Sequence, residues 1–567
     1  MARYDVTAGK NLTSVTLGGN DEMYVSSAGS ATDTVLKGVT YNRAIMQVLN
    51  GGKADRTTIV SSAYLGVANG GCIQNTKQTG GTQDILAGGL TDSATVTGGN
   101  LFLSAGASAT NLIVSANGDM LGNFTSDSYI TGTSHGKAIK LGDGIMQNLT
   151  VYGSYYMTIG DGWTASGTTL RGVTYNSAQM NILDGGEATD TLIVSSAYLG
   201  VANGGYIRNT KQTGGTQNIL AGGLTDSATV TGGNLFLSAG ASATNLIVSA
   251  NGDMLGNFTS DSYITGTSHG KAIKLGDGIM QNLTVYGSYY MTIGDGWTAS
   301  GTTLRGVTYN LAKLIVSNGA KAYNTQITSS AVMHINNGAY AENTLQSGGS
   351  QIIYNGGTAS GGSVKGGTMF VANGGTVKGT ELRTEGSIIL SAGAKAYDLV
   401  LSNSNLGMSA GAQLIRTSVC RGGKLAVSNS NVASDTQVLA GGTATIFSKA
   451  AASGGNVMSG GTLIFSSGAI LTGTINAAGT ITVKNGATVS NGTLNFNLVD
   501  LKAGNRVILN DMSLLTGANY SITVSGSQAE GSYKLANGAG AFNGTITVKN
   551  ESGNTLGSLS IGGTLNA

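Results

Sequence analysis

Short runs of alternating apolar and polar residues, separated by turns rich in glycine and asparagine, recur along almost the whole chain. In one example, Leu101-Phe102-Leu103 follows a turn at Gly98, and Leu112-Ile113-Val114 precedes a turn at Asn117. Runs of this length are too short for helices, whereas alternation between glycine-containing turns is typical of strands. The turns return about every 19 residues, a period that indicates a repeat architecture.

A longer repeat lies over the short one. The pentapeptide Gly-Val-Thr-Tyr-Asn at residues 38–42 returns at 172–176 and at 306–310, an offset of 134 residues in each case. The segments 59–176 and 193–310 differ only where Cys72 is replaced by Tyr206, Gln74 by Arg208 and Asp84 by Asn218. We interpret this near-identity as a duplication of whole modules, which a one-dimensional stack of coils tolerates.

Short strands, tight turns and this period predict an all-β fold, a parallel β-helix or β-solenoid. Each coil is expected to hydrogen-bond to the next at a spacing of about 4.8 Å. Alternate side chains then point into a narrow apolar core, and glycine and asparagine occupy corners that need positive φ. By the crossover rule for parallel strands we expect the helix to be right-handed.

The change in pattern along the chain predicts five segments. Residues 1–34 form an N-terminal cap with the first coils, 35–168 and 169–302 are two copies of the module, and 303–495 are diverged coils. After residue 495 the paired glycines become sparse and the apolar runs lengthen. Because an open solenoid end exposes unpaired backbone groups, we predict a C-terminal β cap at 496–567.

Composition agrees with this architecture and excludes several functions. The chain contains 92 glycines and no proline among 567 residues, and proline is excluded from central strands. A hydrophobic content of 40% with a net charge of +2 is unlike a disordered chain. The same charge balance argues against nucleic acid as a partner, and the chain has no apolar run long enough for a membrane-spanning helix.

Catalytic motifs are sparse, and we expect neither an enzyme nor a cofactor or metal site. The clearest candidates are Asp143 and Asp161, which lie in Gly-Asp-Gly turns about one coil apart and recur at Asp277 and Asp295. Stacked carboxylates could act as a glycosidase pair or bind Ca²⁺. The alternative, which we favour, is that aspartate before glycine simply fits a corner.

Aromatic residues offer a candidate contact surface. If Met157 and Ile159 point inward, then the neighbouring Tyr156 points outward, where it could stack on a sugar or a protein surface. The alternative is that the ring packs along its neighbours in the stack. The predicted surface residues, in the two module copies, are Tyr156 with Trp163 and Tyr290 with Trp297.

The coil resembles the repeat of the AIDA-type autotransporter adhesins over roughly residues 30–490. The segment 347–362, Ser-Gly-Gly-Ser-Gln-Ile-Ile-Tyr-Asn-Gly-Gly-Thr-Ala-Ser-Gly-Gly, carries the likeness best. The resemblance implies a right-handed β-helix at a bacterial cell surface, outer-membrane-associated or secreted, that serves adhesion or self-association. It also implies heptose on Ser and Thr, added by a dedicated glycosyltransferase. The signal peptide and C-terminal barrel of that family are missing here, so we expect an excised passenger, without membrane insertion of its own, or a related repeat-built surface protein.

The leading functional hypothesis is therefore an O-glycosylated surface adhesin or self-association rod, with a host-cell or bacterial surface glycan or protein as partner. The runner-up is a phage tail-spike or a secreted carbohydrate-binding or carbohydrate-active β-helix. That alternative predicts a break in the repeat where acidic or aromatic residues gather, whereas we expect coils of uniform length. An ice-binding solenoid would need one flat threonine ladder, and the outward positions are too mixed for it.

Overall fold

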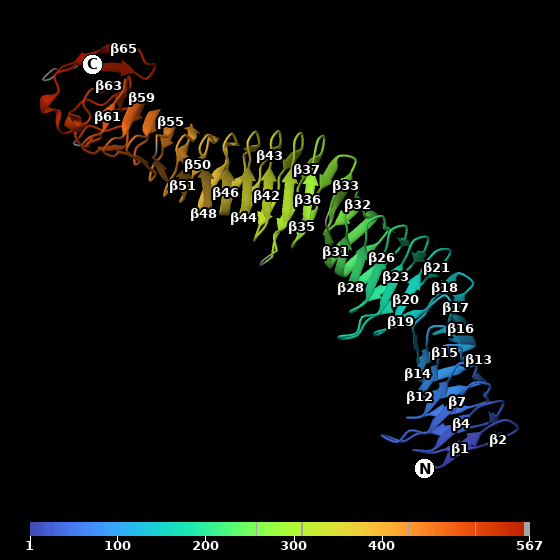
Figure 1. The fold of residues 1–567 in the computed structure, drawn as a ribbon. Coiled ribbons are helices and arrows are strands. Elements are labelled where there is room, and N and C mark those ends of the chain that lie inside the picture. Colours follow the sequence, from blue (N-terminus) through green and yellow to red (C-terminus); the bar gives the residue numbers. More distant parts are fainter. Residues whose placement is uncertain (257, 308–309, 429, 505, 561–567) are drawn as a thin grey trace. The chain divides into compact units, whose positions relative to one another are not determined.

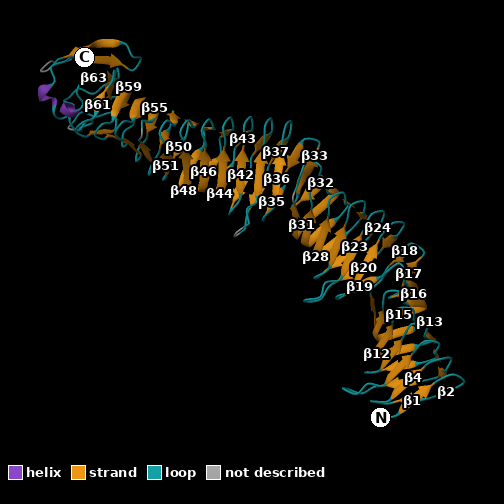
Figure 2. Ribbon diagram, in the orientation of Figure 1, coloured by secondary structure: helices purple, strands orange, loops and turns teal. Residues whose placement is uncertain are grey.

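The computed structural model describes residues 1–256, 258–307, 310–428, 430–504 and 506–560. The fold is all-β, with 57% of residues in strands, and forms a parallel β-solenoid of about 26 turns spaced about 19 residues apart. This confirms the predicted fold class (Figure 1, Figure 2). The chain divides into two compact units, Met1–Gly276 and Asp277–Ala567, whereas the five predicted segments remain a prediction.

Each regular coil contributes one strand to each of three parallel sheets. In the third coil these strands are β7 (Ile45–Val48), β8 (Lys53–Asp55) and β9 (Thr58–Val60). They pair in register with the next coil, at β10 (Tyr64–Val67), β11 (Cys72–Gln74) and β12 (Lys77–Ile85). We call the sheets that contain β7, β8 and β9 the first, second and third sheet.

The core follows the predicted alternation. In β7 and β10 the second and fourth residues are buried, and the first and third face outward or are half-buried, except that Gly66 is also buried. Met46 and Leu65 are fully buried in the first sheet, as are Ile73 in the second and Ile59 in the third. The three sheets therefore enclose one narrow apolar interior, and specific side chains can be presented only on the outer faces or on the turns.

Some strands are longer than the sequence pattern predicts because they continue around a corner. β12, β14 (Thr95–Leu103) and β15 (Ser108–Gly122) each belong to two sheets. The bend in β12 contains Gly81, whose φ is +68°. A Cβ there would meet the backbone oxygens of Ser61 and Ala63, so glycine lets the strand turn without ending.

The expectation of uniform coils is wrong at one place in each module copy. β16 (Tyr129–Ser134) is followed by β17 (Lys137–Gly142), which runs antiparallel to both β16 and β18 (Ile145–Gln147). The second copy repeats this reversal at β32 (Tyr263–Ser268) and β33 (Lys271–Gly276). As a result, Asn123 and Tyr156, which bond to one another, are 33 residues apart, far more than one regular coil.

The reversals are produced by two-residue hairpin turns. Ser134 pairs with Lys137 across His135 and Gly136, whose φ angles are 49° and 77°. Gly142 pairs with Ile145 across Asp143 and Gly144, whose φ angles are 51° and 74°. Positive φ at both central positions is the mark of the type I′ turn, which closes antiparallel pairs.

The second unit also contains the three-sheet coil, and its pattern then changes near the C-terminus. Its first sheet includes β39 (Lys313–Val316), β42 (Val332–Ile335) and β44 (Leu345–Ile353). Its third sheet includes β62 (Thr493–Asn497), and beyond this strand the sheet gains β63 (Asn519–Val524), β64 (Ile546–Asn550) and an antiparallel β65 (Thr555–Leu559). Rings of Phe496 and Tyr520 stack at 6.1 Å, and Phe542 meets Tyr520 edge-on at 5.4 Å.

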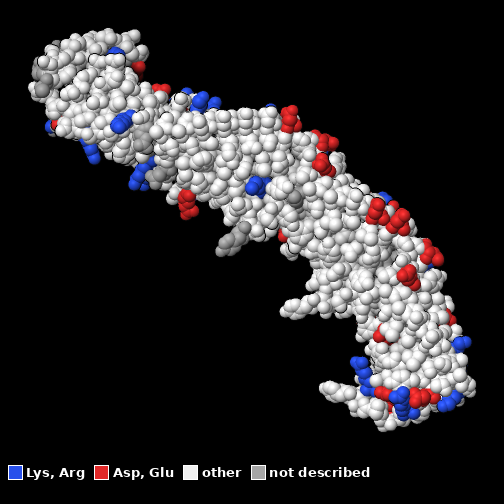
Figure 3. Space-filling view, in the orientation of Figure 1, with Lys and Arg blue, Asp and Glu red and all other residues white. Residues whose placement is uncertain are grey.

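Charged side chains are few on the face drawn in Figure 3, and many of those in the first unit gather over its N-terminal strands. Several pair between successive coils, as when Arg56 bonds Asp33 at 2.7 Å and Arg416 bonds Asp398 at 2.6 Å. Helix in the described part of the chain amounts to single 3₁₀ turns at Met512–Leu514 and Ala539–Ala541. Neither could cross a bilayer.

Candidate ligand-binding groove

The repeated pentapeptide forms a hairpin that projects from the stack. Val39 and Asn42 exchange two backbone hydrogen bonds of 2.9 Å, so Thr40 and Tyr41 form the tip. In Figure 1 the hairpins of the first unit appear as loops beside β4 (Glu22–Val25) and β19 (Thr150–Tyr152). The Tyr41 side chain is 99% exposed and its equivalent Tyr175 is 100% exposed.

The third pentapeptide begins the same way. Val307 and Asn310 exchange backbone bonds of 2.9 Å, while the intervening residues 308–309 lie outside the described chain. In the first two copies the tip of the motif is therefore a surface feature, whereas its first residue, Gly38 or Gly172, is buried against the next coil.

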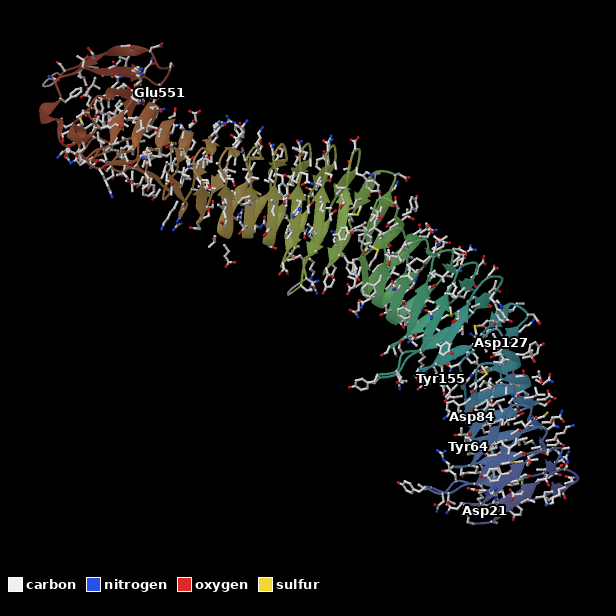
Figure 4. All side chains as sticks on the ribbon, in the orientation of Figure 1. Asp21, Tyr64, Asp84, Asp127, Tyr155 and Glu551 are labelled. Atoms are coloured by element: carbon white, nitrogen blue, oxygen red, sulfur yellow. The ribbon has the colours of Figure 1, made fainter. Side chains whose placement is uncertain are left out.

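A groove of about 550 Å³ lies on the outer face of the first sheet in the first unit. Its floor is made by outward residues of three successive strands, with Tyr64 on β10, Asp84 on β12 and Phe102 on β14. Arg43, on the return arm of the first hairpin, and Tyr155, in the turn before β20 (Tyr156–Ile159), add to its lining. Figure 4 shows Tyr64, Asp84 and Tyr155 following one another along the stack.

Tyr64 and Asp84 are joined across neighbouring strands. The Tyr64 hydroxyl donates to Asp84 Oδ2 at 3.2 Å. Gly66 makes this possible, because a Cβ at that position would lie 3.0 Å from a carbon of the Tyr64 ring. The ring therefore lies over Gly66, which pairs in register with Asp84.

Burial changes the acidity of both groups. Partial removal from water raises the pKa of the Asp84 carboxyl, and the bond from Tyr64 only partly opposes that rise. Burial, with the negative charge of Asp84, raises the pKa of Tyr64 to about 12. Asp84 is thus a half-buried acceptor whose remaining capacity is available to a ligand.

The far wall of the groove is aromatic. Phe102 pairs in register with Asp84, and its ring lies 6.0 Å from the Tyr155 ring at an interplanar angle of 47°. Burial and the nearby charge of Asp84 raise the pKa of Tyr155. The segment between Asn123 and Tyr156, which contains the antiparallel strand β17, places Tyr155 at this wall. The break in the repeat therefore helps to build the groove.

A second cavity of about 630 Å³ adjoins the groove. Its lining includes Glu22, Tyr41 and Ile45, and it shares Arg43 and Thr82 with the groove. The first hairpin therefore borders both cavities.

The second module copy keeps the rings and loses the charges. Tyr198, Asn218 and Phe236 occupy the register positions of Tyr64, Asp84 and Phe102, and Ser177 stands where the first copy has Arg43. The donor direction is reversed, because the Asn218 amide donates to the Tyr198 hydroxyl at 3.3 Å.

The residues predicted from sequence are placed differently. Tyr156 and Tyr290 face outward, with exposed fractions of 45% and 48%, while Met157 and Ile159 are buried. This confirms the predicted alternation. Trp163 and Trp297 are half-buried and precede second-sheet strands, β21 (Thr164–Ser166) and β37 (Thr298–Ser300). Each tryptophan thus belongs to a different sheet from its tyrosine, and the contact role of all four residues remains a prediction.

Sequence reasoning missed Arg43, Tyr64, Phe102 and the site role of Asp84. One signal was available, since Asp84 is among the few positions at which the module copies differ. The others carry no motif, because turns and coils far apart in sequence bring them together.

The paired aspartates have local roles. Asp143 forms an ion pair with Lys140 at 3.2 Å and occupies the hairpin turn after β17. Asp161 lies against the next coil, since a Cβ added to Gly185 would be 2.6 Å from Asp161 Oδ1. Among the described residues, no group of three His, Cys, Asp or Glu side chains could hold a metal ion. Cys72 and Cys420 are both free thiols.

Comparisons with known proteins assign the chain to no family. No protein-family model matches the chain, and no curated protein is similar to it. Among the solved structures, 9 chains match. One is a crystal structure of a TibA fragment hyper-glycosylated by TibC, which is 19% identical and aligns over 83% of this chain and 100% of that fragment. Its TM-score is 0.13, too low to support an argument about this protein.

Proposed function

We propose that this chain is the extracellular, surface-exposed solenoid of a bacterial adhesin, and that it also associates with further copies of itself. The resemblance of its coil to AIDA-type passengers supports the assignment. The architecture suits the role, because the sheets present long outer faces and repeat a few surface features at regular intervals.

The observation that carries the proposal is the pair of projecting tyrosines, Tyr41 and Tyr175. A large aromatic side chain that is almost wholly exposed gains nothing from its position in the folded chain. Tyrosine is enriched at protein interfaces because it supplies a large apolar face together with a hydroxyl. Repetition of the same tip in both module copies gives two equivalent contact points, and two weak contacts made together bind far more tightly than one.

The proposed adhesin carries O-linked sugar on outward Ser and Thr residues, such as Thr158 and Thr164, both exposed. This part follows from the resemblance, with a dedicated glycosyltransferase as partner. Intact mass of the protein from its native cell surface, compared with the 56.8 kDa chain, tests it. Excess mass in heptose- or hexose-sized steps supports glycosylation, and an unmodified mass rejects it.

Display of the chain on otherwise non-adherent bacteria tests the main proposal. We expect displayed cells to aggregate and sediment, and to bind host cells or other bacteria more than cells that display an unrelated solenoid. If the displayed chain changes neither aggregation nor attachment, the adhesin proposal fails.

A carbohydrate-binding β-helix is the second candidate, and the groove favours it. The reversal at β17 is the kind of break that this alternative predicts, and aromatic side chains and one carboxylate, Asp84, gather in the groove that it helps to build. Glycoside hydrolysis ordinarily needs two carboxyl groups about 5 to 9.5 Å apart, whereas Asp84 is the one carboxylate among the described residues that line the groove. We therefore propose binding without catalysis.

A further inference from the structure

We propose that the groove formed by Arg43, Tyr64, Asp84, Phe102 and Tyr155 binds an uncharged oligosaccharide. The proposal rests on the proposed adhesive function for its biological setting only. Its chemistry comes from the side chains that line the groove.

On the groove floor, a ligand can bind only to side chains, because the backbone of each strand is already paired on both sides. β10 pairs with β7 and β12, β12 with β10 and β14, and β14 with β12 and β15. An extended peptide is commonly bound by adding a strand to an open sheet edge, and these strands have none. The ligand must therefore be recognised by side chains that cover the outer face of a complete sheet.

Those side chains match the two surfaces of a sugar. A pyranose ring has polar hydroxyls at its rim and an apolar C–H face. The rings of Tyr64, Phe102 and Tyr155 supply apolar faces against which such a ring can pack. Asp84 accepts hydrogen bonds from hydroxyls, and Arg43 donates them, so adjacent hydroxyls have partners of both kinds.

The charges favour an uncharged sugar. The charged residues among the described lining of the groove are one guanidinium, Arg43, and one carboxylate, Asp84. An anionic sugar is attracted by Arg43 but repelled by Asp84, and a cationic sugar the reverse, so for either charge the attraction by one group is offset by repulsion from the other. An uncharged chain can bond to both groups and meets neither repulsion.

The second module copy provides a comparison within the same protein. Asn218 replaces the acceptor Asp84, and Ser177 replaces Arg43. Charge-assisted hydrogen bonds are roughly twice as strong as neutral ones, so the first copy should hold the sugar more tightly than the second.

The test uses the purified full chain on an array of uncharged, amine-bearing and uronic-acid oligosaccharides, followed by calorimetric titration of the tightest ligand. We expect the tightest ligand to be uncharged. Asp84→Asn and Tyr155→Ala should each weaken it by about tenfold, the change that corresponds to about 1.4 kcal/mol. Phe447→Ala, an aromatic deletion at an exposed position of the second unit, should leave the affinity unchanged.

Three results would overturn the proposal: binding of charged oligosaccharides only, no binding of any oligosaccharide, or an affinity that neither groove variant alters. Circular dichroism of each variant separates lost binding from lost folding. Failure here is distinct from failure of the adhesin proposal, because a purified chain that binds no oligosaccharide would reject the groove, while aggregation of cells displaying it would still keep the adhesin.

Discussion

Tyr64 donates its phenol proton to Asp84 with the oxygens 3.2 Å apart, whereas in the second module copy Asn218 donates to Tyr198 at 3.3 Å. The two pairs occupy equivalent register positions in sheets with nearly identical neighbours. One substitution thus reverses the hydrogen bond and removes a half-buried charge. The chain itself contains both the charged form of this pair and its neutral counterpart.

We expect Asp84→Asn to stabilise the chain at neutral pH. Burial raises the pKa of Asp84 above its ordinary value of 3.8, so the folded state binds that proton more tightly than the unfolded state. The stability contributed by Asp84 is therefore fully present below pH 3.8 and is lost as pH rises through the raised pKa. Calorimetric melting should give the variant a higher midpoint than wild type at neutral pH, with the gap closing on acidification.

Other carboxyls have lowered pKa values and so make stability depend on pH in the opposite direction. Their contributions are the same in wild type and variant and cancel in this comparison. Hydrogen bonds from Ala2 and Gly18 lower the pKa of Asp21, and bonds from Thr110 and Asn111 lower that of Asp92. Both contribute stability above their unfolded pKa that is lost as pH falls, equally in wild type and variant. Equal midpoints for the two proteins at every pH would contradict the prediction.

Removal of the projecting rings should reduce attachment without affecting the fold. In the double variant Tyr41→Ala, Tyr175→Ala, the melting midpoint should stay close to wild type, since surface substitutions away from special features change stability by about 0.5 kcal/mol or less. Sedimentation and attachment of displaying cells should fall by about tenfold, as expected when interface tyrosines are truncated.

Single variants at each tip separate the two contacts. If attachment depends on both tips acting together, Tyr41→Ala alone should lose most of it, because the bivalent advantage disappears. Phe124→Ala, which removes a buried ring, is the contrasting variant. It should unfold coils in addition to reducing attachment. Unchanged attachment in the double variant would reject the role of the tips.

The fold could be predicted because its strongest constraint is local. Alternation places Met46 and Leu65 inside, and glycine or a polar residue with positive φ, such as Gly70 or Asn75, marks many of the corners. Strand direction is not contained in that alternation, since Lys137–Gly142 would show the same pattern in either direction. The Asp143-Gly144 turn was the available signal, because Asp-Gly between alternating runs is a hairpin signature, and the regular period concealed it.

The groove could not be predicted for a different reason. Arg43 and Tyr155 come from turns, and the turn that carries Tyr155 reaches the groove only through the reversal at β17. Tyr64, Asp84 and Phe102 are outward residues of successive coils, a position they share with many residues that line no cavity. Only knowledge of register and of that reversal brings them together.

A buried threonine ladder gives a stability prediction. Thr34, Thr57 and Thr76 occupy the same place in successive coils, are fully or almost fully buried, and have hydroxyls without a hydrogen-bond partner. Thr57→Val replaces such a hydroxyl with a methyl group of similar size and should stabilise by about 1 kcal/mol. The next coil already has Ala94 at this place, so Ala94→Thr is the reciprocal variant and should destabilise.

Denaturant midpoints of the two threonine-ladder variants check the prediction. Hydrogen exchange of β9 would show whether the gain is local, as expected for coils that contact mainly their neighbours. A loss of stability in Thr57→Val would mean that the hydroxyl has a partner after all.

Gly81→Ala should be costly because two penalties coincide. The φ of Gly81 is +68°, and an added Cβ would lie 2.7 Å from the Ser61 carbonyl oxygen. We expect a loss of about 3 kcal/mol or more, from left-handed strain of about 1–2 kcal/mol and a backbone clash. Gly136→Ala is the matched control, since its φ is +77° with nothing within 4 Å, and it should lose only the strain. Similar losses in both variants would show that the clash relaxes.

In the second unit, a chain of side-chain amides runs along the stack and predicts a local effect. The Nδ2 group of Asn456 donates to Gln437, that of Asn476 to Asn456 and that of Asn495 to Asn476, at 2.8, 2.8 and 2.9 Å. Asn476→Ala leaves the half-buried Asn456 oxygen without its donor and removes one of the acceptors of Asn495. A buried polar group without a hydrogen-bond partner costs about 1–3 kcal/mol. The backbone amides of β59 (Ile470–Ala477) and β62 should therefore exchange faster with solvent. Asn485→Ala, at an exposed turn, should leave exchange unchanged, and equal protection in both variants would mean that the ladder adds no stability.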